Sequence, residues 1–337
     1  IKKIIAGMFH PIFPIDKKNF RGRLACYYKR GTVYRAVKKC FAVIKKEAII
    51  VDSDTLFYSY WLSDTALISL SLRKKMKCDV KCISRAHGSD IYDYAQPIGF
   101  NPFQEYIVEH LDYIFPVSNN GNKYLSLKHP TFSKKIITQY LGTKDYGFKI
   151  HKISPNKTIV TCSNIIRIKR LDLFAKLFCE LHKNNENLRW CCIGDGVELK
   201  TIQNIVSDYN AGDYVSFLGK LSNKSILEYY SNHNLSFFVN FSSTEGLPVS
   251  VMEAMSFGIP CFATDVGGTN ELVNSDNGFL MNANESFDYY RDFFESHLLM
   301  GEKEYSLLCY NARKKWQADF NADKNYTSWC ILLRRLI

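Results

Sequence analysis

From residue 50 onward, short apolar runs alternate with amphipathic segments, and this alternation constrains the fold more than any other feature. In the first half of the chain, four such runs have the length and composition of strands. Helical patterns separate them, as at Asp64–Lys75 and Tyr106–Leu111, and Ser118 would cap a further helix. This alternation favours a parallel sheet covered by helices on both faces. The predicted strands are Thr55–Tyr60, Val80–Ala86, Tyr113–Val117 and Ile136–Leu141.

The same alternation restarts after a polar segment at 143–157, which contains a Gly and a Pro and suits a linker. Beyond it the pattern predicts a second parallel sheet with helices on its faces. In such sheets, ligands bind beyond the carboxyl ends of the strands. The predicted strands are Thr158–Cys162, Arg189–Ile193, Val215–Leu218, Leu235–Phe241 and Pro260–Thr264, and the helices are Leu171–Lys183, Val197–Tyr209, Asn223–Ser231 and Pro248–Phe257.

The net charge of +11 comes entirely from the first fifty residues. They hold thirteen Lys and Arg against Asp16 and Glu47, whereas the rest of the chain holds 31 basic and 31 acidic residues. Aromatic residues, among them Tyr27 and Tyr28, lie between the basic ones. A basic, aromatic-bearing helix suits an anionic membrane surface; nucleic acid and a merely solvated basic face are the alternatives. No known nucleic-acid motif accompanies this segment, so we predict a membrane partner and no nucleic acid.

The composition is that of a globular α/β protein. With 46% hydrophobic and 23% charged residues, a chain of 337 residues can bury two cores. No apolar run approaches the roughly 20 residues of a membrane-spanning helix. The eleven cysteines are scattered and lack the paired CxxC units of a zinc site, so we expect free thiols.

The run 243–255 carries two glutamates, Glu245 and Glu253, with seven residues between them. Proline suits the first position of a helix, so a helix is predicted from Pro248 to just before Gly258. Glu253 then lies inside the helix among apolar neighbours, where a carboxylate needs a partner or solvent. Backbone N–H groups at the helix start would attract a phosphate, and sugar hydroxyls would suit the carboxylates. The alternative is a capped helix with one solvated glutamate.

This run resembles the nucleotide-sugar motif of glycosyltransferase family 4, the retaining enzymes of the GT-B superfamily. Other segments match the family's motifs in the expected order over residues 55–280. Each match is weak alone, but their order and spacing together are specific. The chain is most similar to the subgroup of bacterial transferases that build surface polysaccharides. The matching segments are Ser84–Asp90, Ser163–Arg170, Ile193–Gly196, Phe217–Gly219 and Asp265–Glu271.

The resemblance implies the GT-B fold, an α/β architecture of two Rossmann-like domains whose parallel sheets face each other across a cleft. We expect an acceptor-side domain at 1–145, a nucleotide-sugar-binding domain at 156–315, and a C-terminal helix at 316–337 that packs back toward the first domain. The chain opens with an isoleucine, and no Gly-rich turn follows Ile4–Gly7. We therefore expect the first domain to lack its opening strands.

The resemblance also implies the activity, a metal-independent hexosyltransferase without a cofactor. It would transfer a hexose, with retention, from a nucleotide-diphosphate sugar to a lipid-linked glycan acceptor in exopolysaccharide, lipopolysaccharide or O-antigen synthesis. The expected location is the cytoplasm, peripherally at the inner face of the cell membrane. Two alternatives stay open: a GT-B nucleotide-sugar epimerase, which needs no separate acceptor, and a nucleotide-sugar-binding module that truncation leaves inactive.

The motif matches imply roles for individual residues. Lys169 would neutralise the leaving diphosphate, Glu245 would contact the hydroxyls of the donor sugar, and His87 would lie near the reacting sugar. Glu253 would bind the ribose, and glycines would let a loop approach the nucleotide. The implied donor-binding residues are Gly194, Gly196, Leu218, Gly246, Leu247, Pro248, Val249 and Glu253, and the candidates for phosphate or acceptor contacts are Arg85, Asp90, Arg167 and Arg170.

Two positions depart from the family pattern. Asn164 stands where the family usually has an arginine, and Arg170 replaces a common glycine. We expect Arg167 or Arg170 to supply the missing charge. Asp90 has three expected roles: it orients His87, binds the acceptor, or caps the next helix.

Overall fold

The computed structural model describes residues 20–147 and 156–337, and the chain divides into two compact units. The segment Ile4–Gly7, on which the expected loss of the opening strands rests, lies outside the described residues, as do the basic residues before Phe20 and part of the expected linker. Unit 1 comprises Ile1–Tyr140 and Thr327–Ile337, and unit 2 comprises Leu141–Tyr326.

Unit 1 contains a parallel three-stranded sheet in the order β1-β2-β3. The first three predicted strands are present, but the fourth, Ile136–Leu141, is wrong. In the described chain it makes a single bridge, from Ile136 to Ile114. The next pair in register would join Thr138 to Pro116, and proline has no N–H to donate to a neighbouring strand. The strands are β1 (Leu56–Ser59), β2 (Lys81–Ala86) and β3 (Tyr113–Pro116).

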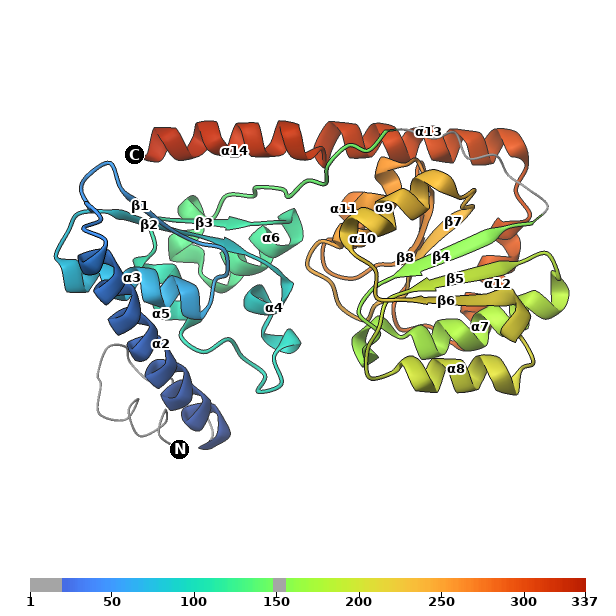
Figure 1. Ribbon diagram of the computed structural model, residues 1–337, viewed down its shortest axis with the longest axis horizontal. Helices are drawn as coiled ribbons and strands as arrows, with labels where there is room; N and C mark the ends of the chain where they lie inside the picture. Colours follow the sequence, from blue (N-terminus) through green and yellow to red (C-terminus); the bar gives the residue numbers. More distant parts are fainter. Residues whose placement is uncertain (1–19, 148–155) are drawn as a thin grey trace. The chain divides into compact units, whose positions relative to one another are not determined.

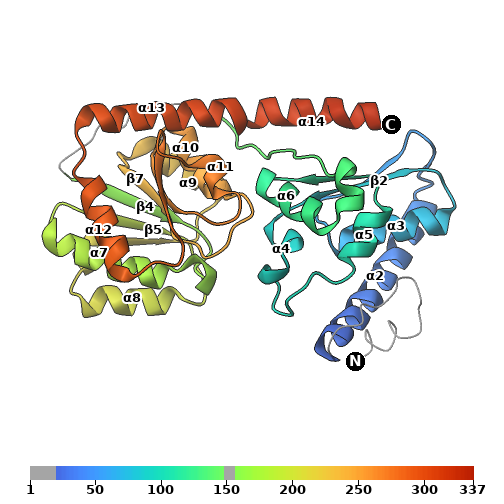
Figure 2. The same ribbon diagram turned by 180° about the vertical axis from the view of Figure 1, so that it is seen from behind.

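Helices cover both faces of this sheet. On one face α3 packs against the strands, α2 and α5, over a core that includes Leu67 and Ile114 (Figure 2). On the other face Trp329 and Leu336 of α14 pack in one cluster with Phe115 of β3. Successive strand residues point to opposite faces, so both layers are filled. The helices are α2 (Phe20–Lys46), α3 (Asp64–Met76), α4 (Gly88–Ile91), α5 (Gln104–His110), α6 (Asn119–Lys128) and α14 (Ala322–Leu336).

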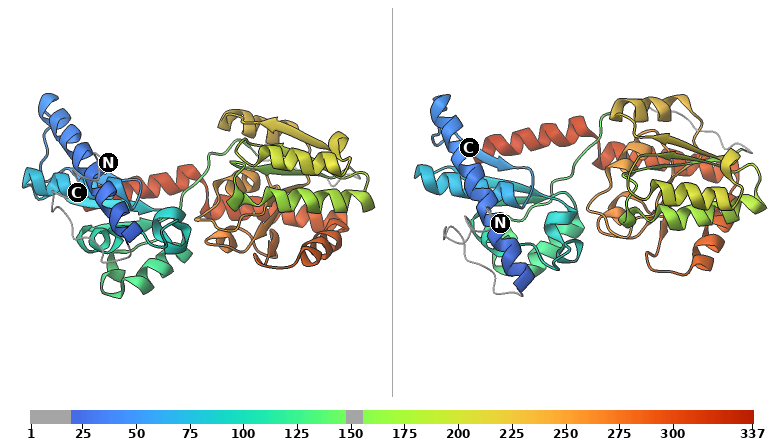
Figure 3. Two further views of the ribbon diagram at one scale, coloured as in Figure 1. Left: turned by 90° about the horizontal axis from the view of Figure 1, so that it is seen from below. Right: turned by 60° about the horizontal axis from the view of Figure 1, so that its bottom comes forward.

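Two local features of unit 1 bear on the sequence predictions. Ser118 caps α6 as predicted, since its Oγ accepts a hydrogen bond from the Gly121 N–H at 3.0 Å. The basic segment forms α2, a helix of 27 residues without an acidic side chain (dark blue in Figure 3). In the part of the chain that the structure describes, no helix has both the length and the apolarity to cross a membrane.

Unit 2 contains a parallel six-stranded sheet in the order β6-β5-β4-β7-β8-β9. All five predicted strands are present, two of them with the predicted bounds. The sixth, β9, was not predicted, because its four residues begin with glycine and give a weak strand pattern. The strands are β4 (Thr158–Cys162), β5 (Arg189–Ile193), β6 (Val215–Gly219), β7 (Phe237–Asn240), β8 (Cys261–Thr264) and β9 (Gly278–Met281).

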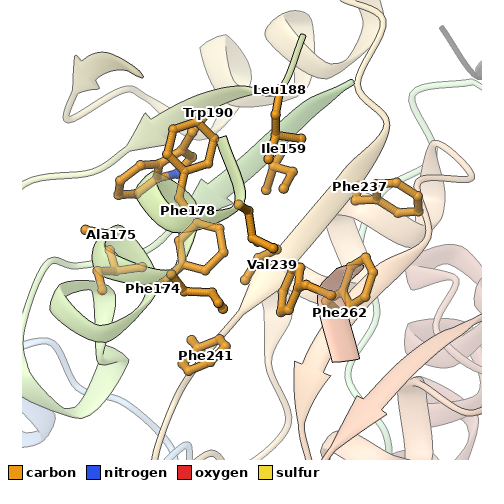
Figure 4. Close-up of a cluster of buried hydrophobic side chains, with 14 of the residues drawn as sticks. Ile159, Phe174, Ala175, Phe178, Leu188, Trp190, Phe237, Val239, Phe241 and Phe262 are labelled. Carbon is orange, nitrogen blue, oxygen red and sulfur yellow. The ribbon is translucent and has the colours of Figure 1, made fainter. Parts of the chain in front are cut away.

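Helices cover both faces of the second sheet, as predicted. Figure 1 shows α7 and α8 along one face and α9, α10 and α13 along the other. The core is rich in aromatic rings: Phe174 of α7 meets Trp190 of β5 edge to face at 5.1 Å (Figure 4). The helices are α7 (Leu171–Asn184), α8 (Leu199–Asp208), α9 (Asn223–Asn232), α10 (Val249–Ser256), α11 (Thr269–Leu272), α12 (Phe287–Leu298) and α13 (Glu302–Asp319).

The strand order of unit 2 reverses between β4 and β7. From β4 the chain moves outward through β5 and β6, then returns to β7 and moves out the other way through β8 and β9. In doubly wound sheets, ligands bind beyond the carboxyl ends of the strands at this switch point. The fold therefore marks the loops after β4 and β7 as the place to look for a site.

Candidate functional site

Glu245 lies in the loop between β7 and α10, and the protein holds its carboxylate by one oxygen. Oε1 accepts hydrogen bonds from Lys169 Nζ (2.6 Å), Ser242 Oγ (2.7 Å) and Asn240 Nδ2 (3.2 Å). Oε2 has no donor among the described residues. Since the side chain is 11% exposed, this oxygen is available to a ligand in a largely desolvated place.

Lys169 ends a short 3-10 helix, η3 (Arg167–Lys169), in the loop after β4. Its ion pair with Glu245 joins the loops on either side of the switch point. The backbone reinforces this link, because the Ser243 N–H donates to the Ile168 carbonyl at 2.8 Å. A small hollow lies beside the pair, and its lining includes Thr161, Cys162, Asn240, Ser242 and Ser250.

Glu253 lies on α10 and is buried, with 8% of its surface exposed. Its Oε1 accepts a hydrogen bond from Asn223 Nδ2 at 2.6 Å. Burial raises the pKa of the carboxyl above its ordinary value, and the Asn223 hydrogen bond offsets part of this rise. Oε2 has no donor among the described residues. A ligand hydroxyl that donates to this oxygen would stabilise the largely desolvated carboxylate.

The start of α10 lies one residue later than predicted. Pro248 is the N-cap and Val249 is the first helical residue. Leu247 and Pro248 are buried, whereas Val249 is exposed; Leu218, near the end of β6, is half-buried. The first N–H groups of a helix have no acceptor within the helix, so this helix start can still bind an anion.

The loop after β8 supports the loop that carries Glu245. The Gly268 N–H donates to the Gly246 carbonyl at 2.8 Å. Gly267 has a φ of +56°, and a Cβ there would stand 1.8 Å from the Glu245 carbonyl oxygen. A side chain at position 267 would therefore displace the backbone of Glu245.

Gly194 and Gly196 are required by packing between loops. A Cβ at position 194 would stand 1.9 Å from the Ser163 carbonyl oxygen, and one at position 196 would stand 2.2 Å from that of Ile165. The Gly194 N–H also donates to the Gly219 carbonyl at 2.8 Å. The glycines thus join the loops after β4, β5 and β6, and their contact with a nucleotide stays a prediction.

Arg170 is not placed to contact a phosphate, contrary to the prediction. Its Nε donates to the Phe241 carbonyl (2.7 Å), its Nη1 to the Ala283 carbonyl (2.5 Å) and its Nη2 to the Ser242 carbonyl (3.4 Å). The guanidinium is thereby used to hold together the loops after β7 and β9. Arg167 is exposed and stays a candidate for the phosphate contact.

Arg85 is likewise not available to a ligand, and this prediction is wrong. The side chain is 1% exposed on the face of the sheet that α14 covers. Its guanidinium lies 4.6 Å from the ring centre of Trp329, and Nη1 donates to the Gln139 carbonyl at 3.1 Å. Its position within β2, rather than in the loop after it, directs the side chain into the core.

His87 follows β2 and packs against two aromatic rings. The centre of its ring is 4.6 Å from that of Tyr60 and 4.3 Å from that of Trp61. Asp90 accepts the His87 backbone N–H on Oδ1 and the Leu62 N–H on Oδ2 (2.7 Å). Its Oδ2 is 4.0 Å from His87 Nδ1, too far for a hydrogen bond. Of the three roles expected for Asp90, the structure shows the cap.

Several other groups have structural roles or low reactivity. The Asp-x-Asp sequence at 52–54 forms a turn, in which Asp52 Oδ1 accepts from the Asp54 N–H and the Thr55 Oγ1, both at 3.1 Å. All eleven cysteines are free, as expected, and burial raises the pKa of the Cys162 thiol to about 12. The described residues contain no cluster of His, Cys, Asp or Glu that could hold a metal.

The sequence prediction missed the three side chains that orient the carboxylates. Asn240 and Ser242 could have been found, since Asn240 ends β7 and Ser242 lies two residues later, at the carboxyl end of the sheet. Asn223 gave no local signal, because it lies 30 residues before Glu253 and meets it through the packing of α9 against the sheet.

Unit 2 is a doubly wound α/β sheet with a lysine–carboxylate pair and a second buried carboxylate near its switch point, which is where proteins of this class bind their ligands. A family profile described as glycosyl transferases group 1 matches residues 144–315. The chain belongs to this family, and its fold is of the GT-B type.

Curated relatives and solved structures agree with this assignment. The GtfA subunit of a UDP-N-acetylglucosamine–peptide N-acetylglucosaminyltransferase from Limosilactobacillus reuteri is 24% identical over 339 residues, covering 92% of this chain and 62% of that protein. The O-antigen biosynthesis glycosyltransferase WbnH from Escherichia coli is 25% identical over 224 residues, covering 65% and 61%. The crystal structure of the pneumococcal O-GlcNAc transferase GtfA with UDP and GlcNAc has a TM-score of 0.71 at 17% identity, covering 89% and 60%. This chain thus spans less than two thirds of each of these proteins.

Proposed function

We propose that the chain transfers a hexose, with retention, from a nucleoside diphosphate sugar to a hydroxyl of a glycan acceptor. The observation that carries this proposal is a pair of carboxylates that the protein holds by one oxygen each. In the proposed complex, Glu245 Oε2 accepts hydrogen bonds from the hydroxyls of the donor sugar. Glu253 Oε2 accepts them from the ribose. Both oxygens gain partners that the described chain does not supply.

The leaving group is the nucleoside diphosphate, and its developing negative charge needs fixed positive charge nearby. Lys169 and the N–H groups at the start of α10 supply that charge, with Arg167 as a further contact. The bond from the anomeric carbon to the phosphate oxygen breaks as the acceptor oxygen attacks from the same face. The acceptor's proton passes to the departing phosphate oxygen. Because these groups supply the charge, we propose that the transfer needs neither a metal nor a cofactor.

The relatives suggest the substrates. The pneumococcal transferase binds UDP and GlcNAc, and WbnH is named for O-antigen biosynthesis. We therefore propose a UDP-sugar donor and a lipid-linked glycan acceptor in surface-polysaccharide synthesis. His87 of unit 1 would hydrogen-bond the reacting sugar.

The donor site is tested by thermal shift and product analysis. UDP should raise the Tm of the parent chain more than GDP or ADP does. Glu253→Ala should weaken the UDP shift, and Glu245→Ala should lower transfer more than UDP affinity. The site assignment is wrong if both variants bind and transfer like the parent.

An isomer formed from donor alone would indicate an epimerase instead. Nuclear magnetic resonance of the product gives the anomeric configuration, and activity in a metal chelator tests the role of metals.

We also propose that residues 1–50 bind an anionic membrane surface and place the enzyme at the cytoplasmic face of the cell membrane. The described part of this segment, α2, ends in Lys45 and Lys46 and exposes Phe20, Tyr28 and Val43. The basic residues of such a helix attract anionic lipid, and its apolar side chains become buried at the membrane surface. Sedimentation with vesicles should show binding to anionic vesicles that falls as salt is added. Equal sedimentation with neutral vesicles, or none at low salt, would contradict this part of the proposal.

A further inference from the structure

We propose that Tyr60 and Trp61 form an aromatic platform on which a sugar ring of the acceptor stacks, an inference that rests on the proposed function. Both residues directly follow β1, at the carboxyl end of the sheet in unit 1. The strands β1 and β2 are parallel, with Ser59 opposite Ser84. The loop of Tyr60 and Trp61 therefore lies beside the loop of His87, and no nucleotide-binding residue assigned above lies in this unit.

The two rings are exposed, and for Trp61 this is unusual among the tryptophans of the chain. Tyr60 is 46% and Trp61 is 42% exposed, whereas Trp190, Trp316 and Trp329 are at most 6% exposed. Leaving a large aromatic side chain in water forgoes roughly 1.5–3 kcal/mol of burial. Paired exposed rings at the carboxyl end of a parallel sheet are surfaces that a ligand can cover.

The backbone of the loop that carries the platform is held in place before any ligand binds. The two rings meet edge to face, with centres 5.7 Å apart and planes at 83°. The next residue, Leu62, is 1% exposed and anchors the loop in the core. Asp90 then ties this loop to the loop of His87, because it accepts a backbone N–H from each. Such preorganisation lowers the entropy cost of binding.

His87 indicates the chemistry of the ligand. Both nitrogens of its ring are buried against the platform, and neither has a hydrogen-bond partner among the described residues. A buried polar atom without a partner costs about 1–3 kcal/mol. A pyranose offers an apolar face of C–H groups to a ring and hydroxyls at its rim, so it would satisfy both features once a ring edge moves aside. An acyl chain would leave the nitrogens unpaired.

Trp61 provides a direct test, since it is the tryptophan whose fluorescence solvent and ligands can reach. We expect methyl glycosides of glucose, galactose or N-acetylglucosamine to quench it saturably, with glycerol as the polyol control. Tyr60→Ala should weaken this binding about tenfold, while Tyr310→Ala, which removes an exposed ring on α13, should not. A UDP thermal shift without quenching by any glycoside overturns the platform and leaves the donor site standing. Quenching without a UDP shift supports the platform and contradicts the proposed donor site.

Steady-state kinetics give an independent test. Trp61→Ala should raise the acceptor KM about tenfold and leave the UDP thermal shift unchanged, while Trp61→Phe should stay within about threefold of the parent. A merely structural role would instead lower Tm in both variants without a selective change in the acceptor KM. An acceptor KM within about twofold of the parent in Trp61→Ala would also overturn the proposal.

Discussion

The two units assemble their motif residues in opposite ways. In unit 2, Lys169 lies 76 residues before Glu245, whereas Glu253 follows Glu245 within the same short run. The first two meet at 2.6 Å at the carboxyl end of one sheet, and the third is held on the helix that follows. Parallel strands end on the same side, so the loops after them converge whatever their separation along the chain.

In unit 1 the motif residues are close neighbours in the sequence, yet they separate in space. Arg85 is still within β2 and turns into the core under α14, while Asp90 accepts backbone N–H groups. His87 stays with its ring nitrogens unpartnered among the described residues. Position relative to the end of a strand, rather than membership of a motif, therefore decides which side chain can meet a ligand.

The comparison predicts its largest effect at Lys169. Lys169→Met removes the charge proposed to face the leaving diphosphate, so transfer should fall about 100- to 1,000-fold. Global stability should also fall, by about 1–3 kcal/mol, because the largely buried Glu245 carboxylate loses its cationic partner. Initial rates with a radiolabelled donor measure the loss, with the exposed Lys176→Met on α7 as the matched control. Transfer within twofold of the parent would refute the role.

Gly267 tests whether the site of unit 2 depends on the packing of its loops. Gly267→Ala forces a side chain into a left-handed position and against the Glu245 carbonyl oxygen. We expect a loss of about 2–3 kcal/mol in the free energy of unfolding, together with weaker UDP binding. Urea titration measures the loss in the free energy of unfolding. Gly212→Ala, where nothing lies within 4 Å of the new Cβ, should be nearly neutral. Equal free energies of unfolding in Gly267→Ala and Gly212→Ala would contradict this prediction.

Two arginines sharpen the contrast between the units. Arg85→Ala should lower the free energy of unfolding by about 2 kcal/mol, because it leaves a cavity under Trp329, and should not alter UDP affinity. Arg167→Ala should change stability by less than about 0.5 kcal/mol and weaken UDP binding severalfold. Denaturation measures the free energy of unfolding of both variants, and calorimetry measures their UDP affinity. If Arg85→Ala kept full stability but bound UDP more weakly, the structural role assigned to Arg85 would be wrong.

The smallest expected effect concerns Glu253 and pH. Burial raises the pKa of its carboxyl in the folded chain, so the folded state binds the proton more tightly than the unfolded state. Stability is therefore lost as pH rises from the unfolded pKa through the folded one, and it stays lower above that. Glu253→Gln removes this loss and keeps an acceptor for Asn223. Near neutral pH its Tm should be about 2 °C higher, although UDP binding is weaker.

The pH dependence separates this effect from an ordinary change in packing. The Tm difference between Glu253→Gln and the parent should be small below the ordinary pKa of a glutamate, grow as pH rises through the raised pKa, and level off above it. A constant difference across this range would mean that the carboxyl's ionisation does not cost stability. Differential scanning fluorimetry in a series of buffers is sufficient.

The sequence was informative where a signal is local. The alternation of strands and helices, the cap at Ser118 and the positions of Glu245 and Glu253 follow from short windows of residues. It failed where the outcome depends on contacts between distant segments. The directions of Arg85 and Arg170 are set by α14 and by the loop after β9, and neither is visible in the motif itself. Asn223 was missed for the same reason.

Unit 1 is made from two pieces of the chain, with the 186 residues of unit 2 between them. During synthesis, the apolar surface around Ile83 and Phe115 emerges long before Trp329, which packs on it. At ordinary translation rates of roughly 5–20 residues per second, that surface waits for about 10–40 seconds. A nascent chain stalled before residue 327 should therefore carry a folded unit 2 beside a protease-sensitive unit 1. Chaperones that bind exposed apolar strands should bind this stalled chain more tightly than they bind the released protein.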